Sequence, residues 1–219
     1  GLYVGKGALR AGRVIVHDIG IPADILAGED YLTHVIDGAL VRSWLPRRPA
    51  DGHKGNFGKV LVVGGSRGYT GAPIMAARGA LRSGAGLVSL AVPEPVYQIA
   101  AIKCDEAMPS PLPVGEDGEL DESALMPLLG MLAGKDAALL GPGLGRSAGA
   151  ESLVYSVLTT VDFPLVVDAD GINALSRHMD ILDGRRDCPT IVTPHDGEFA
   201  RMGGDLSDGD RLGAARRFT

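Results

Sequence analysis

Between Lys59 and Thr193, short apolar runs alternate with longer stretches whose apolar residues have helical spacing. The runs are Lys59–Val63, Leu87–Val92, Ala137–Leu140, Leu165–Asp168 and Thr190–Thr193. The segments between them with helical patterns are Ala72–Ser83, Pro95–Cys104, Glu122–Leu132, Ala150–Thr160 and Gly171–His178. Continuous apolar runs are typical of parallel strands buried on both faces. The alternation therefore predicts an α/β fold of three αβα layers with a mostly parallel sheet.

Chemically distinctive residues follow four of the five predicted strands. The segments are GGSRGYTGAP (64–73), GPGLGRS (141–147), DADGINAL (168–175) and TPHDGEF (193–199). Right-handed crossovers bring the carboxyl ends of parallel strands to one edge of a sheet. Open parallel sheets bind their ligands at that edge. We therefore expect the four segments to form one ligand site.

The first of these segments predicts a phosphate site. Gly65 and Gly71 permit backbone conformations that let a ligand approach closely, and Pro73 suits the first turn of a helix. Free N–H groups at a helix start attract an anion. The alternative is a glycine turn that only connects a strand to a helix. The Gly-Lys-Ser/Thr of a P-loop does not follow.

The second segment resembles a dinucleotide-binding fingerprint. Gly143, Gly145 and Ala148 have the G-x-G-x-x-A spacing, and Asp168 lies 20 residues beyond Ala148. A short glycine pattern is weak evidence in a chain with 32 glycines. A Rossmann dehydrogenase therefore stays an alternative. Asp168 and the nearby Asp170 suit Mg2+ waters or a ribose hydroxyl, and equally suit helix capping. Asp168, at the strand end, is the one of the two that we take as a candidate substrate contact.

The fourth segment places His195 and Glu198 three residues apart, on one face of a helix start. Glu198 is a candidate for holding a hydrated Mg2+, and His195 for donating to a substrate oxygen. A zinc site is not expected, because no further ligand lies at suitable spacing. Lys54, before the first strand, is a candidate for reaching the ligand edge; the alternative is a solvated lysine.

The net charge and the hydropathy of the chain limit the kinds of partner that it can bind. The net charge of −6 argues against general binding to nucleic acid or to a membrane surface. No apolar run approaches the roughly 20 residues needed to span a bilayer. The two cysteines, Cys104 and Cys188, fit no metal spacing and are expected to be reduced. We expect a cytoplasmic protein with small-molecule nucleotide partners.

The N-terminal quarter has a different character. It contains one predicted strand at Arg13–Val16, an amphipathic helix at Glu29–Leu45 and a linker rich in proline, glycine and charge. A lone strand needs a sheet to pair with, and none is predicted nearby.

The ordered motifs HKGNFGKVLVVGGSRGYTGAP, ALRSGAGLVSLAVP, LLGPGLGRS, PLVVDADGINAL and TIVTPHDGEFARM resemble the ADP/ATP-dependent NAD(P)H-hydrate dehydratase family. The resemblance covers residues 52 to about 218 and implies a ribokinase-like fold. Residues 1–27 look like the tail of a preceding NAD(P)HX epimerase domain. The resemblance then makes residues 28–52 a helix and linker, and residues 53–219 the N-terminal part of the dehydratase domain.

The resemblance implies nicotinamide nucleotide repair. The S epimer of NADHX or NADPHX would be phosphorylated on its ring hydroxyl by ADP or ATP with Mg2+, and elimination of phosphate would restore NADH or NADPH. By motif, Ala72, a glycine of GPGLG (Gly145 being favoured) and His195 look like substrate contacts. The His-x-x-Glu ending at Glu198 looks like the Mg2+ element of ribokinase-like enzymes. A homo-oligomer, for example a tetramer, is expected.

The family's later Lys-Gly segment and its Gly-x-Gly-Asp motif, which carries the expected base, do not occur in the 219 residues. We therefore expect no catalytic base in this chain and expect it to be an inactive fragment of a longer bifunctional protein. Two further alternatives stay open: a ribokinase-like kinase of a vitamin precursor, and a non-catalytic nucleotide-binding module.

Overall fold

The computed structural model describes residues 2–28 and 33–219, and the chain divides into two compact units, Gly1–Asp51 and Gly52–Thr219. The described part of the first unit contains three short helices: α1 (Gly5–Arg10), α2 (Ala23–Gly28) and α3 (Gly38–Trp44). The strand predicted at Arg13–Val16 is wrong, because among the described residues this segment pairs with no strand. An extended segment without a partner has no ladder of hydrogen bonds to stabilise it.

The helix predicted over Glu29–Leu45 is shorter than expected. Residues 29–32 lie outside the described residues, and the helix α3 begins only at Gly38. The Asp37 carboxylate accepts hydrogen bonds from the N–H groups of Ala39 (3.0 Å) and Leu40 (2.8 Å). An aspartate in this position starts a helix, so the local capping chemistry overrides the longer apolar pattern.

The second unit contains a six-stranded sheet in which every neighbouring pair is parallel. The strands are β1 (Lys59–Val63), β2 (Leu87–Pro93), β3 (Met108–Leu112), β4 (Ala137–Leu140), β5 (Leu165–Val167) and β6 (Thr190–Val192). Their order across the sheet is β3-β2-β1-β4-β5-β6. The predicted α/β fold with a parallel sheet is confirmed.

Strand β3 was not predicted from the sequence. It contains Pro109 and Pro111, which pair in register with Leu90 and Val92 of β2. Proline has no N–H to donate and is therefore confined to edge strands. β3 lies at the edge of the sheet, where this loss costs little.

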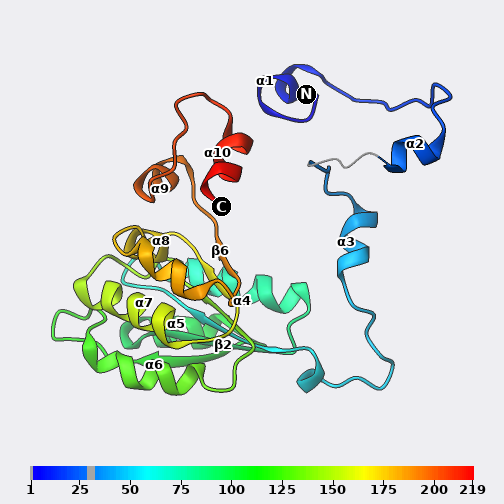
Figure 1. Ribbon diagram of the computed structural model, residues 1–219. Coiled ribbons are helices and arrows are strands. Elements are labelled where there is room, and N and C mark those ends of the chain that lie inside the picture. Colours follow the sequence, from blue (N-terminus) through cyan, green and yellow to red (C-terminus); the bar gives the residue numbers. More distant parts are fainter. Residues whose placement is uncertain (1, 29–32) are drawn as a thin grey trace. The chain divides into compact units, whose positions relative to one another are not determined.

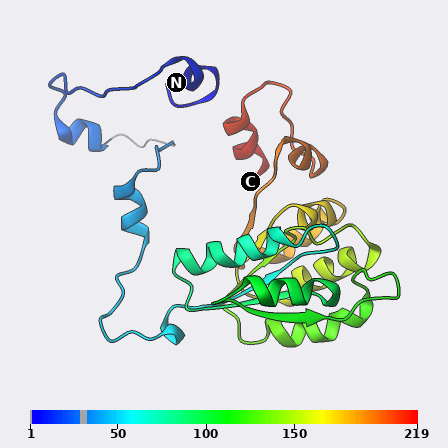
Figure 2. The same ribbon diagram turned by 180° about the vertical axis from the view of Figure 1, so that it is seen from behind.

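Helices cover both faces of the sheet, as Figures 1 and 2 show from opposite sides. The helices α4 (Gly71–Ser83) and α5 (Glu94–Lys103) lie on one face, and α6 (Leu125–Leu132), α7 (Ala148–Thr160) and α8 (Asp170–Leu175) lie on the other. Successive residues of β1 point to opposite layers. Val62 packs with the α4–α5 layer, whereas Leu61 and Val63 pack with the α6–α7 layer. Burial on both faces explains why the strands have uninterrupted apolar sequences.

The remaining elements are η1 (Lys54–Asn56), η2 (Glu122–Ala124), η3 (Met179–Arg185), α9 (Asp196–Arg201) and α10 (Arg211–Phe218). Helix α10 is the last element of the chain, and the rings of Phe199 in α9 and Phe218 in α10 lie 5.0 Å apart. Within the described ranges, no helix combines the length and apolar character needed to traverse a bilayer.

A buried arginine supports the strand that leads into the candidate site. The Arg185 guanidinium donates to the carbonyl oxygens of Leu158 (2.9 Å) and Phe163 (2.8 Å) and to Thr190 Oγ1 (2.9 Å). It thus satisfies carbonyl groups at the end of α7 and ties them to the start of β6. Its position fixes β6, and β6 carries the segment that contains His195.

Candidate functional site

The sheet has a topological switch between β1 and β4. From β1 the chain moves outward to β2 and β3, and it then returns to the other side of β1 for β4, β5 and β6. Open α/β sheets bind ligands beyond the strand carboxyl ends at such a point. The loops that leave β1 and β4 are those that contain the two glycine-rich segments. The sheet topology therefore places the glycine-rich segments where a ligand is expected.

The two glycine-rich loops contact each other directly. The Gly65 N–H donates to the Pro142 carbonyl oxygen (3.0 Å), and Ser66 Oγ donates to the Gly143 carbonyl oxygen (2.9 Å). A Cβ atom on Gly64 would lie only 2.5 Å from the Pro142 oxygen. The expectation that the Gly65 backbone is free to hold a phosphate is therefore not supported, because the neighbouring loop uses its N–H.

The start of helix α4 remains open. Gly71 and Ala72 are exposed, and the Thr70 side chain makes no capping hydrogen bond. A Cβ added to Gly71 would meet nothing within 4 Å. The first N–H groups of a helix have no partner within the helix, and the helix dipole favours an anion there. This helix start is therefore the part of the first loop that suits a phosphate.

The structure brings Ala72 and Gly143 together. A Cβ on Gly143 would lie 2.8 Å from Tyr69 Cβ and 3.6 Å from Ala72 Cβ. Gly143 and Gly145 both have positive φ angles, of 65° and 86°. Side chains rarely adopt this conformation, so both positions require glycine for the path of the loop.

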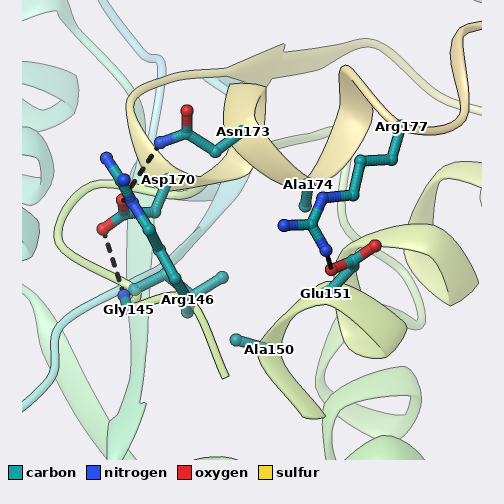
Figure 3. A pocket seen from close by; sticks show the side chains of 9 residues that line it. Gly145, Arg146, Ala150, Glu151, Asp170, Asn173, Ala174 and Arg177 are labelled. Carbon is teal, nitrogen blue, oxygen red and sulfur yellow. Dashed lines mark hydrogen bonds and ion pairs between the residues drawn. The ribbon is translucent and has the colours of Figure 1, made fainter. Parts of the chain in front are cut away.

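Figure 3 shows that Asp170 reaches back from α8 to the loop that contains Gly145. Its Oδ2 accepts the Gly145 N–H (3.1 Å), and its Oδ1 lies 3.2 Å from Arg146 Nε and 3.3 Å from Asn173 Nδ2. Asp170 therefore does not cap its own helix; it binds the loop that follows β4. Only Asp168 was predicted as a substrate contact.

A small pocket of about 30 Å3 lies between α7, α8 and the β4 loop (Figure 3). Two ion pairs line it: Arg146 with Asp170, and Arg177 Nη1 with Glu151 Oε2 at 2.6 Å. Each guanidinium is thus paired with a carboxylate. The lining charges cancel, so the pocket shows no excess positive charge for a phosphate.

Asp168 lies at the end of β5 and faces β6. Its Oδ1 accepts a hydrogen bond from Thr193 Oγ1 (2.8 Å). The same bond links the DADGINAL and TPHDGEF segments, because Thr193 opens the second of them. Asp168 is half-buried, and its neighbour Ala169 has a φ angle of 50°.

His195 and Glu198 form a reciprocal cap at the start of α9. The N–H groups of Gly197 and Glu198 donate to His195 Nδ1 (3.0 and 3.3 Å), and the His195 N–H donates to Glu198 Oε2 (2.9 Å). Because Nδ1 accepts, the ring proton belongs on Nε2, which lies 3.2 Å from Glu198 Oε1. The His195 side chain is 68% exposed, whereas that of Glu198 is 8% exposed. The Nε2 proton expected to meet a substrate already faces Glu198.

The residues present suit a Mg2+ ion held mainly by water and phosphate. In the described part of the chain, no three His, Cys, Asp or Glu side chains converge on a metal position. Mg2+ keeps several waters and is commonly bound through one or two carboxylates and the phosphates of a substrate. A single buried Glu198 at the site edge fits that mode better than a cage made only of protein ligands.

Lys54 is not brought to this edge. It precedes β1, and its carbonyl oxygen lies against Gly86, directly before β2. Since β1 and β2 are parallel, this contact marks the amino edge of the sheet. The prediction that Lys54 reaches the ligand edge is therefore wrong, because a residue before a parallel strand lies at the opposite end from the loops that follow it.

Two participants were missed by the sequence analysis. Ser66 joins the two glycine loops, and Arg201 Nε donates to Asn173 Oδ1 (2.9 Å) to join α9 to α8. Ser66 is a buried polar residue within a glycine-rich loop, which was an available signal. No sequence pattern indicates the role of Arg201, because its hydrogen bond depends on how α9 packs against α8.

Comparison with known proteins identifies the family. The profile of the NAD(P)H-hydrate dehydratase family matches residues 60–219. The whole chain is 45% identical to a bifunctional NAD(P)H-hydrate repair enzyme Nnr from Moorella thermoacetica, and it covers 42% of that protein. An ADP-dependent (S)-NAD(P)H-hydrate dehydratase from Lactiplantibacillus plantarum is 35% identical over 75% of the chain, which covers 55% of that protein. The chain thus spans about two fifths to one half of the length of these curated relatives.

Solved structures agree with this result. The ADP/ATP-dependent NAD(P)H-hydrate dehydratase from Bacillus subtilis, co-crystallized with ATP/Mg2+, matches with a TM-score of 0.62 and 31% identity, over 82% of this chain and 60% of that one. A ribokinase-like superfamily protein from Enterococcus faecalis also matches with a TM-score of 0.62, at 28% identity over 78% of this chain and 57% of that one. The fold is therefore ribokinase-like, and the chain belongs to the NAD(P)H-hydrate dehydratase family.

Proposed function

We propose that this chain supplies the substrate-binding part of an enzyme that dehydrates the S epimer of NADHX or NADPHX with ADP or ATP. The observation that carries the proposal is family membership together with the meeting of the β1 and β4 loops at the topological switch. The repaired nucleotides would be NADH and NADPH.

The reaction has a simple chemical logic. Hydroxide is a poor leaving group, so the ring hydroxyl is first phosphorylated. Phosphate then leaves with the electron pair of its C–O bond, and loss of a proton from the neighbouring ring carbon forms the double bond. Phosphoryl transfer needs positioning and neutralisation of charge more than covalent chemistry from the protein. Mg2+, when bound, supplies that neutralisation on the donor phosphates. The chain's own part is to bind and orient the nucleotide.

Roles follow from position. Ala72, Gly143 and Gly145 would line the nicotinamide nucleotide, and the open start of α4 at Gly71 would face a phosphate. Asp168 and His195 would contact the substrate from the β5 and β6 ends. Glu198 would hold Mg2+ through water. The contact between Ala72 and Gly143 supports the first of these roles.

The test is an assay of NADHX, followed by the return of NADH fluorescence, with ADP, with ATP, without nucleotide and with EDTA. We expect turnover that needs a nucleotide and is abolished by EDTA. The vitamin precursor hydroxymethylpyrimidine serves as the competing substrate. Its phosphorylation without any NADHX turnover would replace the proposal by the kinase alternative.

We also propose that the 219 residues bind substrate without completing the reaction. The absence of a Gly-x-Gly-Asp segment from these residues motivates this part. The assay is therefore run on this chain and on a full-length protein that contains it, with calorimetry of NADPH and ADP binding beside it. Turnover by the 219 residues alone would overturn this part and leave the reaction itself standing.

A further inference from the structure

The Gly145 N–H group is not available to a ligand. It donates to Asp170 Oδ2, while Asp170 Oδ1 accepts hydrogen bonds from Arg146 Nε and Asn173 Nδ2. The Asp170 side chain is 19% exposed, compared with 71% for Arg146. The carboxylate is thus enclosed by the groups that it binds (Figure 3). Any contact of a substrate with Gly145 would therefore use the Cα or the carbonyl group of this residue, because the Asp170 carboxylate binds its N–H.

The same network continues to the other half of the site. The Asn173 side chain donates through Nδ2 to Asp170 and accepts through Oδ1 from Arg201 Nε (2.9 Å). Arg201 is the last residue of α9, the helix that begins with the cap formed by His195 and Glu198. One amide side chain therefore connects the Gly145 loop with the helix that carries the candidate Mg2+ residue.

The backbone on both sides of Asp170 directs its side chain toward the Gly145 loop. A Cβ on Gly171 would lie 2.8 Å from the Leu140 carbonyl oxygen and 3.1 Å from Gly141 Cα, so α8 starts in close contact with the end of β4. Ala169 is, among the described residues, the one non-glycine residue with a positive φ angle. Such a conformation costs about 1–3 kcal/mol and persists where surrounding contacts fix it. The three contacts of the adjacent Asp170 meet that condition.

We infer that Asp170 is a positioning residue that holds the Gly145 loop and, through Asn173 and Arg201, sets its placement relative to His195 and Glu198. This inference rests on the proposed function. Arg146 is largely exposed, so its ion pair with Asp170 contributes little to stability. The part-buried bonds from the Gly145 N–H and from Asn173 Nδ2 are the ones that fix the loop. Displacing a substrate-positioning group by about 1 Å can cost 100-fold in rate.

The first experiment measures amide hydrogen exchange at Gly145 in the whole chain and needs no activity. Asp170→Ala removes the acceptor, and we expect the Gly145 N–H to exchange about 5- to 10-fold faster, the effect of losing one hydrogen bond. Arg177→Gln, which breaks the neighbouring pair with Glu151, is the matched control and should leave this exchange rate unchanged. An unchanged rate in Asp170→Ala would overturn the inference.

The second experiment measures KM and kcat for NADHX in a full-length protein that contains this chain. Asp170→Ala should raise the KM about 10- to 100-fold, with Asp170→Asn restoring part of the loss because one oxygen remains as an acceptor. The KM for ADP should not change in either variant. Equal changes in Arg177→Gln would show that any disturbance of the pocket has the same effect, and would contradict a positioning role.

A double-mutant cycle tests the link to α9. Asn173→Ala and Arg201→Gln should each lower kcat/KM, and the double variant should be no worse than the more damaging single one, because both break the same connection. Additive losses would separate α9 from the loop and overturn the link. If the unaltered protein turns over no NADHX, the proposed function fails, while the exchange measurement still decides whether Asp170 holds the loop.

Discussion

Two four-residue segments, HKGN at 53–56 and HDGE at 195–198, fold in the same way at opposite edges of the sheet. In each, the histidine Nδ1 accepts a hydrogen bond from the N–H two positions later, and the histidine N–H donates to the side-chain oxygen of the fourth residue. His53 lies before β1, at the amino edge, whereas His195 lies after β6, at the carboxyl edge. The local chemistry is shared, and the position in the sheet differs.

The two segments share a capping histidine but differ in the burial of the fourth residue. The fourth residue is the exposed Asn56 in one segment and the buried Glu198 in the other. A buried carboxylate has to be compensated, and here the His195 N–H and ring both face it. A histidine cap alone therefore indicates only the start of a helix. A buried Glu198 at the carboxyl edge of the sheet indicates, in addition, a candidate ligand site.

The largest effect is expected from the glycine that packs against the first segment. A Cβ on Gly86 would overlap the Lys54 carbonyl oxygen, so Gly86→Ala should displace η1 and lower the free energy of unfolding by about 3 kcal/mol. Gly204→Ala, beside the Phe199 ring, is the counterpart at the second segment and should cost less, since a ring can shift. Urea unfolding measures both. Equal losses would show that neither segment is held more rigidly than the other.

Replacing the buried acid should next separate the two segments by activity. Glu198→Gln keeps the shape of the cap but removes the charge, so we expect a loss of about 10- to 100-fold in kcat/KM, as for groups that support a metal ion. Asn56→Ala is the matched change in the other segment and should leave kcat/KM unaltered. Steady-state assays of a full-length protein that contains this chain, across a range of Mg2+ concentrations, check this. A fully active Glu198→Gln enzyme would remove Glu198 from the proposed site.

Loss of a single cap should have a smaller and equal effect on stability in the two segments. His53→Ala and His195→Ala should each cost about 1 kcal/mol in the free energy of unfolding. Asparagine is a good cap, so His53→Asn and His195→Asn should regain that stability. In a full-length protein that contains this chain, only the His195 variants should raise the KM for NADHX, and the KM of His195→Asn should stay raised. Full activity of His195→Asn would reduce His195 to a cap.

The smallest expected effect is a local change in the turn after α9 at low pH. The Ser207 N–H lowers the pKa of Asp205, and the Asp210 N–H lowers the pKa of Asp208, both in the turn after α9. A lowered folded-state pKa gives stability that is present above the unfolded value, about 3.9, and is lost as the pH falls through the folded value. The Ser207 and Asp210 amide signals should therefore change below about pH 4. The Gly86 amide, which donates to the carbonyl oxygens of Phe57 and Gly58, has no titratable acceptor and should not change over this range.

The fold was largely predictable because the sheet is buried on both faces, so its strands are visible as apolar runs. β3 escaped because two of its five residues are prolines, which suggest a loop unless the strand is known to lie at an edge. In the first unit, the pattern at Glu29–Leu45 suggested a long helix, and the Asp37 cap set a shorter one.

The sequence predicted which loops form the candidate site, but it did not predict the contacts and hydrogen bonds between those loops. The Gly64–Pro142 contact and the Asp170–Gly145 bond join residues that are far apart in sequence, so they depend on which strands become neighbours. The misplacement of Lys54 was avoidable, since a residue before a parallel strand always lies at the amino edge. The glycines indicated close approach correctly. Whether a ligand or another loop approaches is decided by the topology.

The proline-containing edge strand has a consequence for how copies of this protein can meet. Pro109 and Pro111 offer no N–H group along that flank, so it is a poor template for adding a strand from another molecule. Sheet-to-sheet fusion, the route by which many α/β proteins aggregate, is disfavoured on this side. Any association of copies across β3 would lack hydrogen bonds donated by the backbone of these two prolines.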